Sequence, residues 1–305
     1  MYEIKISVII PTYNEEKNIS KLLYSLLNQS HKPDEIIISD GGSTDKTVDI
    51  INNIKKKNDL IKLCGRKGKC RGAGRNSAIE FSKNKIIALI DSGTVASKNW
   101  LENLYKSSIN LRNKIVFGSI QSLYDDYVSR NIANFIYGKD NKSETLNFSV
   151  SSLLLEKSIW EKVGKFPESK KGNYVVEDLR FIERIKKNNI EYNICEKAIV
   201  YWKLPNTYLS IFNRYKEYSI GAFENNYSKI WHYKVFRNYL FLLLIIFLTI
   251  ILLNYKYLLI ILTCLIFFRS HTYIRNKEKY KNSFFKKLFV FFVTSFILIL
   301  IDATA

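Results

Sequence analysis

Short apolar runs alternate with amphipathic segments along most of the chain, and this pattern predicts an α/β fold. The runs that predict buried strands cover residues 4–10, 35–39, 60–64, 86–90, 115–120, 148–155 and 192–202. Apolar positions recur at helical spacing in 19–27, 48–54, 75–81, 100–111, 157–163 and 177–185. The alternation predicts βαβ units and a mostly parallel, Rossmann-like sheet, whose right-handed crossovers bring the loops after the strands to one edge.

Polar residues in the connecting loops predict how the helices begin. Asn14 is expected to cap the first helix, and Ser43 or Thr44 the second. The acids at 177–178 fall in the first turn of a helix, where they suit its dipole. Residues 124–145 are polar and aromatic without a clean period, so we expect a loop or helix over the sheet edge where the loops meet.

The character of the chain changes near residue 234. Before it charged residues are frequent, whereas after it the chain is strongly apolar apart from a basic segment at 269–287. Long apolar stretches are typical of membrane-spanning helices, and the candidate spans are 235–253, 257–268 and 285–301. We therefore expect a catalytic domain over 1–234 and a membrane region over 235–305.

The basic segment also indicates the orientation in a cell membrane. Three spans place it on the same side as the catalytic domain, as the positive-inside rule favours, whereas a single bent element at 239–268 would separate them. Residues 206–224 carry apolar and basic residues at helical spacing, which predicts an amphipathic helix at the membrane surface. The apolar run at 7–10 is too short for a signal peptide, so we expect the catalytic domain in the cytoplasm.

The net charge of +19 has three candidate sources: nucleic-acid binding, attraction to anionic lipid or substrate, and a general lysine bias. The lysines are scattered, which favours the bias, with membrane proximity adding to it. No aromatic RNA-binding pair or zinc-finger pattern occurs, so we expect no nucleic-acid partner. The four cysteines form no close pair and the three histidines are dispersed, which argues against a disulfide framework or a zinc cluster.

The strand at 86–90 ends abruptly in Asp91, Ser92 and Gly93. In open α/β sheets, ligands bind beyond the carboxyl ends of the strands. Asp91 therefore marks the centre of a hypothetical nucleotide-sugar site, where its oxygens could hold a divalent cation. The alternative is that Asp91 only caps the end of the strand.

Other loops on the same edge carry residues with two interpretations each. Asp40 could accept hydrogen bonds from a base or ribose, or it could cap a helix. Glu177 and Asp178 could supply a general base, or cap a helix. A third group could neutralise a diphosphate or form a solvated loop, and it comprises Arg66, Lys67, Lys69, Arg71 and Arg75.

Two motifs at the start of the chain, SVIIPTYNE at 7–15 and DGGSTDKT at 40–47, resemble those of the family 2 glycosyltransferases. Further matches are the GRN of 74–76, the LIDS of 89–92, the WEKVGKFPE of 160–168 and the ED of 177–178. The resemblance covers about residues 4–224. It implies a GT-A fold and an inverting transfer from a nucleoside-diphosphate sugar.

The resemblance also implies roles for particular residues. Asp178 would deprotonate the acceptor hydroxyl, with Glu177 beside it, and Asp91 would meet a divalent cation, Mg or Mn, as the first acid of a DxD motif. Arg75 would lie near the diphosphate. The implied nucleotide-sugar-binding residues are Pro11, Thr12, Tyr13, Glu15, Asp40, Gly42, Arg71, Arg75, Asp91 and Ser92.

Two departures from the family pattern point to thinner metal coordination. Gly93 replaces the second acid of the DxD motif, and Tyr201 and Trp202 stand where many members have a histidine. A membrane-anchored subgroup looks similar at both places, with a trailing helix like that at 214–221. We therefore expect a variant site with fewer protein ligands to the metal, rather than an inactive one.

The main functional hypothesis is transfer of a sugar to a lipid-linked or membrane-proximal glycan, in polysaccharide or glycoconjugate synthesis. One alternative is a polyprenyl-phosphate glycosyltransferase, which makes an activated lipid sugar. Another is a non-catalytic membrane scaffold that retains the fold. Asp40, Arg75 and Asp178 argue against the scaffold, whereas Gly93 argues for it.

Overall fold

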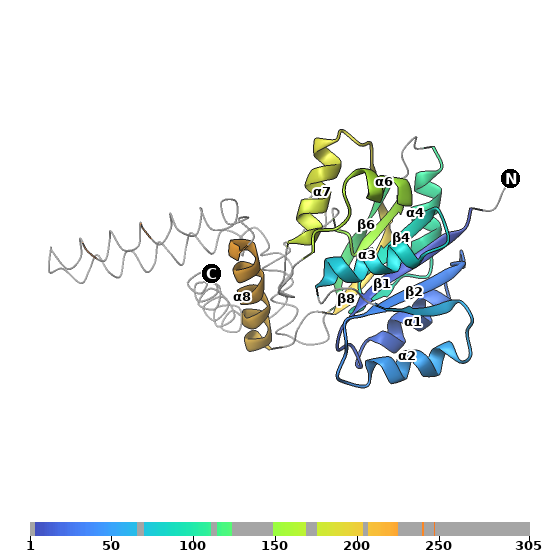
Figure 1. Cartoon of the computed structure of the whole chain (residues 1–305), viewed down its shortest axis with the longest axis horizontal. Helices are drawn as coiled ribbons and strands as arrows, with labels where there is room; N and C mark the ends of the chain where they lie inside the picture. Colours follow the sequence, from blue (N-terminus) through green and yellow to red (C-terminus); the bar gives the residue numbers. More distant parts are fainter. Residues whose placement is uncertain are drawn as a thin grey trace, which may run out of the picture. The chain divides into compact units, whose positions relative to one another are not determined.

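The computed structural model describes residues 4–65, 70–110, 115–123, 149–168, 176–203 and 207–224, with the single positions 240 and 247 (Figure 1). The chain forms two compact units, one of residues 1–123 with 142–203 and one of 124–141 with 204–305. The first contains an eight-stranded sheet, and the described helix of the second is α8 (Tyr208–Glu224).

The sheet has the strand order β3-β2-β1-β4-β7-β6-β8-β5. In chain order the strands are β1 (Ile6–Thr12), β2 (Glu35–Asp40), β3 (Ile61–Cys64), β4 (Ile86–Ile90), β5 (Thr94–Ala96), β6 (Ile115–Leu123), β7 (Ser152–Glu156) and β8 (Asn193–Lys203). Strands β3, β2, β1 and β4 are mutually parallel, which confirms the predicted βαβ half. In the other half β6 and β8 are also parallel, so the sheet is mostly parallel as predicted. The exceptions are β7, which runs antiparallel to both neighbours, and β5, which runs antiparallel to β8.

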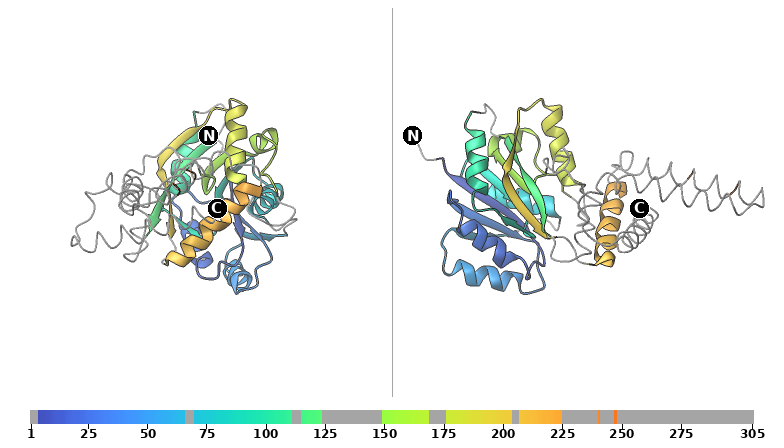
Figure 2. Two further views of the ribbon diagram at one scale, coloured as in Figure 1. Left: turned by 90° about the vertical axis from the view of Figure 1, so that its left-hand side faces the viewer. Right: turned by 180° about the vertical axis from the view of Figure 1, so that it is seen from behind.

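Helices cover both faces of the sheet, so the apolar runs need no alternation. On β1, Val8 packs with α1 and α4, whereas Ile9 packs with the helices of the opposite face. Figure 2 shows the strands enclosed between these helices. The helices of this unit are α1 (Ile19–Leu27), α2 (Thr47–Lys55), α3 (Arg71–Phe81), α4 (Trp100–Ser108), α6 (Lys157–Lys162) and α7 (Glu177–Lys187).

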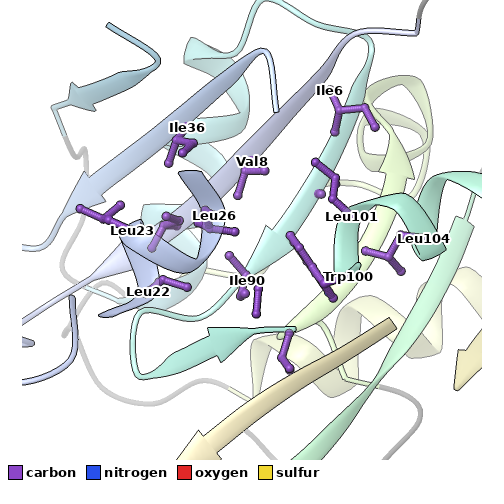
Figure 3. Close-up of a cluster of buried hydrophobic side chains, with 14 of the residues drawn as sticks. Ile6, Val8, Leu22, Leu23, Leu26, Ile36, Ile90, Trp100, Leu101 and Leu104 are labelled. Atoms are coloured by element: carbon purple, nitrogen blue, oxygen red, sulfur yellow. The ribbon is translucent and has the colours of Figure 1, made fainter. Parts of the chain in front are cut away.

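The core on the α1 and α4 face is shown in Figure 3. Leu22, Leu23 and Leu26 of α1 and Trp100 of α4 are fully buried against the strands. The Trp100 indole donates a hydrogen bond of 2.8 Å to the Ser152 hydroxyl, so its polar atom is satisfied in the apolar surroundings.

The predicted helix caps are wrong, because those side chains connect two loops instead. Asn14 has a φ of +52°, and its side-chain oxygen accepts a hydrogen bond of 2.9 Å from the Thr44 amide. The Asn14 amide in turn donates 2.8 Å to the Ser43 hydroxyl. The residues before α1 and α2 are Asn18 and Lys46. The loops after β1 and β2 are thereby bonded to each other.

The remaining predictions concern a short strand, the helix at 206–224 and the membrane spans. The three-residue strand β5 was not predicted, because it is too short to show a period. Helix α8 confirms the helix predicted at 206–224, and its Leu209 is 69% exposed. Apart from the single positions 240 and 247, the predicted spans lie outside the described residues, as does the segment at 124–145. Within the described part of the chain, no helix combines the length and hydrophobicity needed to cross a bilayer.

Gly118 on β6 supplies a test of the packing. A Cβ on Gly118 would lie 2.1 Å from the Ser152 hydroxyl and 2.4 Å from the Ala198 carbonyl oxygen. We expect Gly118→Ala to destabilise the chain by at least about 1–3 kcal/mol, since the Ala198 backbone must move. Urea unfolding followed by tryptophan fluorescence measures this loss.

The matched control is Gly65→Ala, because a Cβ at Gly65 would meet no atom within 4 Å. It should change the stability by less than about 0.5 kcal/mol. Equal unfolding midpoints for the two variants would contradict the packing described at Gly118.

Candidate active site

The Arg75 guanidinium joins three acidic side chains at one edge of the sheet. Arg75 is fully buried, and its Nη2 donates a hydrogen bond of 2.8 Å to Asp91 Oδ1. Its Nη1 donates to Asp178 Oδ1 and lies 3.3 Å from Glu177 Oε1. The arginine comes from α3, Asp91 follows β4, and the other two acids begin α7. The structure therefore brings together four charged residues from three segments that are far apart in the sequence.

Small residues let α3 approach closely enough to place Arg75. A Cβ on Gly72 would lie 2.1 Å from the Pro167 carbonyl oxygen, so only glycine fits beside that backbone. The Asn76 side chain holds the same segment, accepting from the Phe166 amide at 3.0 Å and donating to its carbonyl at 2.9 Å. The Phe166 ring lies under the Arg75 guanidinium, with 5.4 Å from its carbon to the ring centroid.

Asp91 is held as an anion. Its Oδ2 accepts a hydrogen bond of 2.6 Å from the Ser151 hydroxyl, and its Oδ1 faces Arg75. Burial alone would raise the pKa of Asp91, but the positive charges of Arg75 and Arg71 outweigh it and lower the pKa to about 2. The alternative that Asp91 only caps a strand is wrong, because its carboxylate binds partners from two other segments.

Asp178 has the opposite electrostatic character. Burial raises its pKa to about 7, and the negative charges of Glu177 and Asp91 add to this against the attraction of Arg75. Its side chain is 20% exposed, whereas that of Glu177 is 1% exposed. A partly accessible carboxylate with a pKa near neutrality suits proton transfer.

The backbone that presents these acids is strained. Val176, directly before α7, has φ 45° and ψ 34°, a left-handed conformation that is rare for a β-branched residue. Its side chain makes no capping bond to the helix. Glu177 and Asp178 fall in the first turn of α7, as predicted; neither is the residue before the helix, and both face Arg75.

Most of the predicted nucleotide residues lie at the carboxyl ends of β1 and β2 or in the loops that follow them. Both Asp40 oxygens are used within its own loop, accepting from the Gly42 and Ser43 amides at 2.8 Å and from the Ser43 hydroxyl at 2.5 Å. Asp40 therefore holds a turn, in which Gly42 has a φ of +84°, and the helix-cap alternative is wrong. The Thr12 hydroxyl is buried with no hydrogen-bond partner among the described residues, whereas Tyr13 is 57% exposed.

The remaining predicted residues are placed less centrally. Ser92 is buried, and Pro11 lies within β1. Arg71 is 42% exposed, with its Nη1 3.9 Å from Glu177 Oε1. The basic residues at 66–69 lie outside the described residues. Among the residues that are described, no group of three or more histidines, cysteines or acids is arranged to hold a metal.

Two residues of the site escaped the sequence reasoning. Ser151 contacts Asp91 only because β7 runs antiparallel beside β4, with Ile90 paired to Ser152. Phe166 reaches Arg75 through the turn after α6. Neither carries a local signal, although Phe166 lies in a stretch that matched the family pattern.

Comparison with known proteins gives a family match. Residues 7–164 match the model described as glycosyl transferase family 2. An uncharacterized glycosyltransferase of Haemophilus influenzae is 30% identical over 174 residues, which are 55% of this chain and 68% of that protein. A poly(ribitol-phosphate) beta-glucosyltransferase of Bacillus spizizenii is 36% identical over 123 residues.

Another relative, from Escherichia coli, is a UDP-Glc:alpha-D-GlcNAc-diphosphoundecaprenol beta-1,3-glucosyltransferase, 36% identical over 122 residues. The Bacillus and Escherichia matches each cover 39% of this chain, but only 19% and 46% of those proteins. The chain thus spans less than half the length of both.

Solved structures share the fold. Staphylococcus aureus TarS, solved with UDP-GlcNAc, superposes with a TM-score of 0.53 at 21% identity, over 72% of this chain and 66% of that one. A Pyrobaculum calidifontis mannosyltransferase, solved with GDP-Man and Mn²⁺, also has a TM-score of 0.53, at 19% identity over 72% and 63%.

The buried arginine leads to a stability prediction. Arg75→Met leaves three carboxylates without their main counter-charge and should cost about 3–5 kcal/mol at neutral pH. Without the arginine, the pKa values of the buried acids are higher in the folded chain than in the unfolded chain. The folded state therefore binds more protons, and the variant becomes less stable as the pH rises. Unfolding at pH 5 and pH 8 measures the stability difference from the wild-type chain, which should be larger at pH 8.

A matched control is Lys162→Met, which removes an exposed cation from α6. It should stay within about 0.5 kcal/mol of wild type. An Arg75→Met chain as stable as this control would show that the four charged groups do not form the buried cluster described.

Proposed function

We propose, since the chain belongs to glycosyl transferase family 2, that it is an inverting enzyme using a nucleoside-diphosphate sugar. The acceptor in this proposal is a lipid-linked or membrane-proximal glycan. The observation that carries the proposal is the pairing of Asp91 and Asp178 across one arginine. This arrangement puts a permanent anion and a carboxylate of near-neutral pKa at the same edge of a GT-A-like sheet.

Asp178 is the group that handles the proton. The acceptor hydroxyl attacks the anomeric carbon while the bond from that carbon to the diphosphate oxygen breaks, which inverts the configuration. The hydroxyl proton passes to Asp178, whose raised pKa suits this transfer near pH 7. Arg75 holds Asp178 in place, and buried Glu177 sustains the raised pKa through its negative charge.

The nucleotide is assigned to the carboxyl ends of β1 and β2 and the loops that follow them, with α3 beside the diphosphate. The Thr12 hydroxyl is a buried polar group able to bond a ligand there. Exposed Tyr13 offers a ring on which a base can stack. Arg71, beside Glu177, offers a partly exposed positive charge to the diphosphate. In the turn held by Asp40, Gly42 has a positive φ that favours glycine, and its lack of a side chain leaves room for the nucleotide.

The described residues fit a divalent cation, Mg or Mn. Three carboxylates outnumber the two arginines around them, so the cluster is net negative. Mg²⁺ sites commonly use one or two carboxylates together with substrate phosphates. Asp91 is the candidate ligand, since each of its oxygens keeps a lone pair beyond its present hydrogen bond. A bound cation would stabilise the charge that develops on the departing diphosphate.

The acceptor and the location follow from separate arguments. The names of the Bacillus and Escherichia relatives specify a ribitol-phosphate polymer and a diphosphoundecaprenol-linked sugar. The apolar composition after residue 234 supports a multi-pass membrane region, with the domain of residues 1–234 on the cytoplasmic side. The exposed Leu209 supports a surface-bound role for α8.

Transfer of a labelled sugar to acceptors in a lipid extract of membranes tests the proposal. The full chain should transfer label from a nucleotide sugar in a screen of UDP- and GDP-sugars. Asp178→Asn should lower the rate by about 10²–10⁴-fold, because it removes the base. Nucleotide binding, measured by calorimetry, should remain.

The matched control is Glu183→Gln, an exposed acid on the same helix, which should retain full transfer. Loss of nucleotide binding in Asp178→Asn would remove the role given to that residue. Label found on polyprenyl phosphate alone would assign the chain to lipid-sugar activation. A chain that binds no nucleotide would instead be a scaffold.

The rate should also depend on pH through Asp178. The base works only when ionised, and burial raises its pKa to about 7, so kcat/KM should fall about tenfold per pH unit below that value. A pH profile from 5 to 9 measures this acidic limb. A rate that stays constant down to pH 5 would exclude Asp178 as the base.

A further inference from the structure

The space next to Gly93 already contains a carboxylate. A Cβ built on Gly93 would lie 3.3 Å from Glu15 Oε1 and 3.8 Å from Oε2. Glu15 comes from the loop after β1, whereas Gly93 follows β4. The Glu15 carboxylate therefore lies where a side chain at position 93 would point.

The turn that carries Gly93 is tightly held to Asp91. The Asp91 carbonyl oxygen accepts hydrogen bonds of 3.1 Å from the Thr94 amide and 2.7 Å from the Thr94 hydroxyl. Gly93 thus stands at a set place, two residues beyond the carboxylate of Asp91. Glu15 approaches this turn, whereas Arg75 donates a hydrogen bond to the Oδ1 atom of Asp91.

Glu15 is held as firmly as the turn. Its amide donates 2.7 Å to the Thr47 hydroxyl, and its carbonyl oxygen accepts 2.9 Å from the Ile19 amide in α1. Its Oε2 accepts 2.8 Å from the Asn18 side-chain amide. These bonds orient the carboxylate, and Oε1 is the oxygen that lies nearest to Gly93.

We infer that Glu15 supplies the second carboxylate of a divalent-cation site with Asp91, in place of the acid absent at position 93. The two carboxylates and the diphosphate of the nucleotide provide the oxygen ligands that Mg²⁺ and Mn²⁺ accept. This inference rests on the proposed function, because the diphosphate completes the site. It makes the site a two-acid site assembled from the loops after β1 and β4.

Mn²⁺ binding, measured by electron paramagnetic resonance on the full chain with UDP or GDP, tests the inference. Glu15→Gln should weaken Mn²⁺ binding in the nucleotide complex by at least about tenfold. Loss of a residue that only supports a metal ligand already lowers metal affinity by about this factor, and loss of a ligand should cost no less. Nucleotide affinity in EDTA should change little. The control Glu16→Gln, which alters the neighbouring acid, should leave both affinities unchanged.

A second variant separates loss of a ligand from loss of structure. Adding Gly93→Asp to Glu15→Gln restores a carboxylate at the same place, and Gly93 does not use a left-handed conformation that would exclude aspartate. We expect the double variant to regain most of the Mn²⁺ affinity. A folding defect caused by Glu15→Gln would not be repaired this way.

Other results would contradict the role of Glu15, the cation site or the proposed function. Unchanged Mn²⁺ affinity in Glu15→Gln overturns the role of Glu15. So does an equal loss of nucleotide affinity in Mn²⁺ and in EDTA, which would limit Glu15 to a ribose contact. A double variant that fails to recover also overturns it. Nucleotide binding that ignores Mn²⁺ overturns the cation site alone, whereas a wild-type chain that binds no nucleotide overturns the proposed function as well.

Discussion

A single buried guanidinium is the constraint on which the rest of the site depends. A charge without access to water is stable only when opposite charges and hydrogen bonds replace the lost solvation. Arg75 obtains these from Asp91, which follows β4, and from Glu177 and Asp178, which begin α7. Helix α3, the end of β4 and the start of α7 must therefore all be in place together, and folding of this edge is coupled to assembly of the site.

The same arginine gives its partners different chemistry. Asp91 bonds through one oxygen to Arg75 and through the other to Ser151, so its charged form is favoured. Burial raises the pKa of Asp178, and the negative charge of Glu177, a second and deeply buried acid beside Arg75, adds to this, so the neutral form of Asp178 gains. Two carboxylates on one cation thus acquire a fixed charge and a titrating charge, which is the division of labour that group transfer to a hydroxyl requires.

The sequence could predict elements whose signal is local. The strand before Asp91 and the helix that begins at Glu177 both show as apolar patterns beside acids, and the family motifs add roles by resemblance. What it could not predict depends on contacts between distant segments. Asn14 was expected to cap a helix but binds the Thr44 amide thirty residues away, and Glu15 meets Gly93 across two loops. The antiparallel entry of β7, which brings Ser151 to the site, also has no local signal.

Ser151, in the turn directly before β7, and Ser152, the first residue of β7, have different surroundings. The Ser151 hydroxyl bonds the Asp91 carboxylate, while the Ser152 hydroxyl accepts from the Trp100 indole in the core. Successive side chains of an extended chain alternate between faces, so a one-residue insertion or deletion here would exchange their environments. The core would lose its acceptor and the site its donor at once. Homologous chains should therefore vary in length elsewhere, leaving the spacing between these two hydroxyls and β7 unchanged.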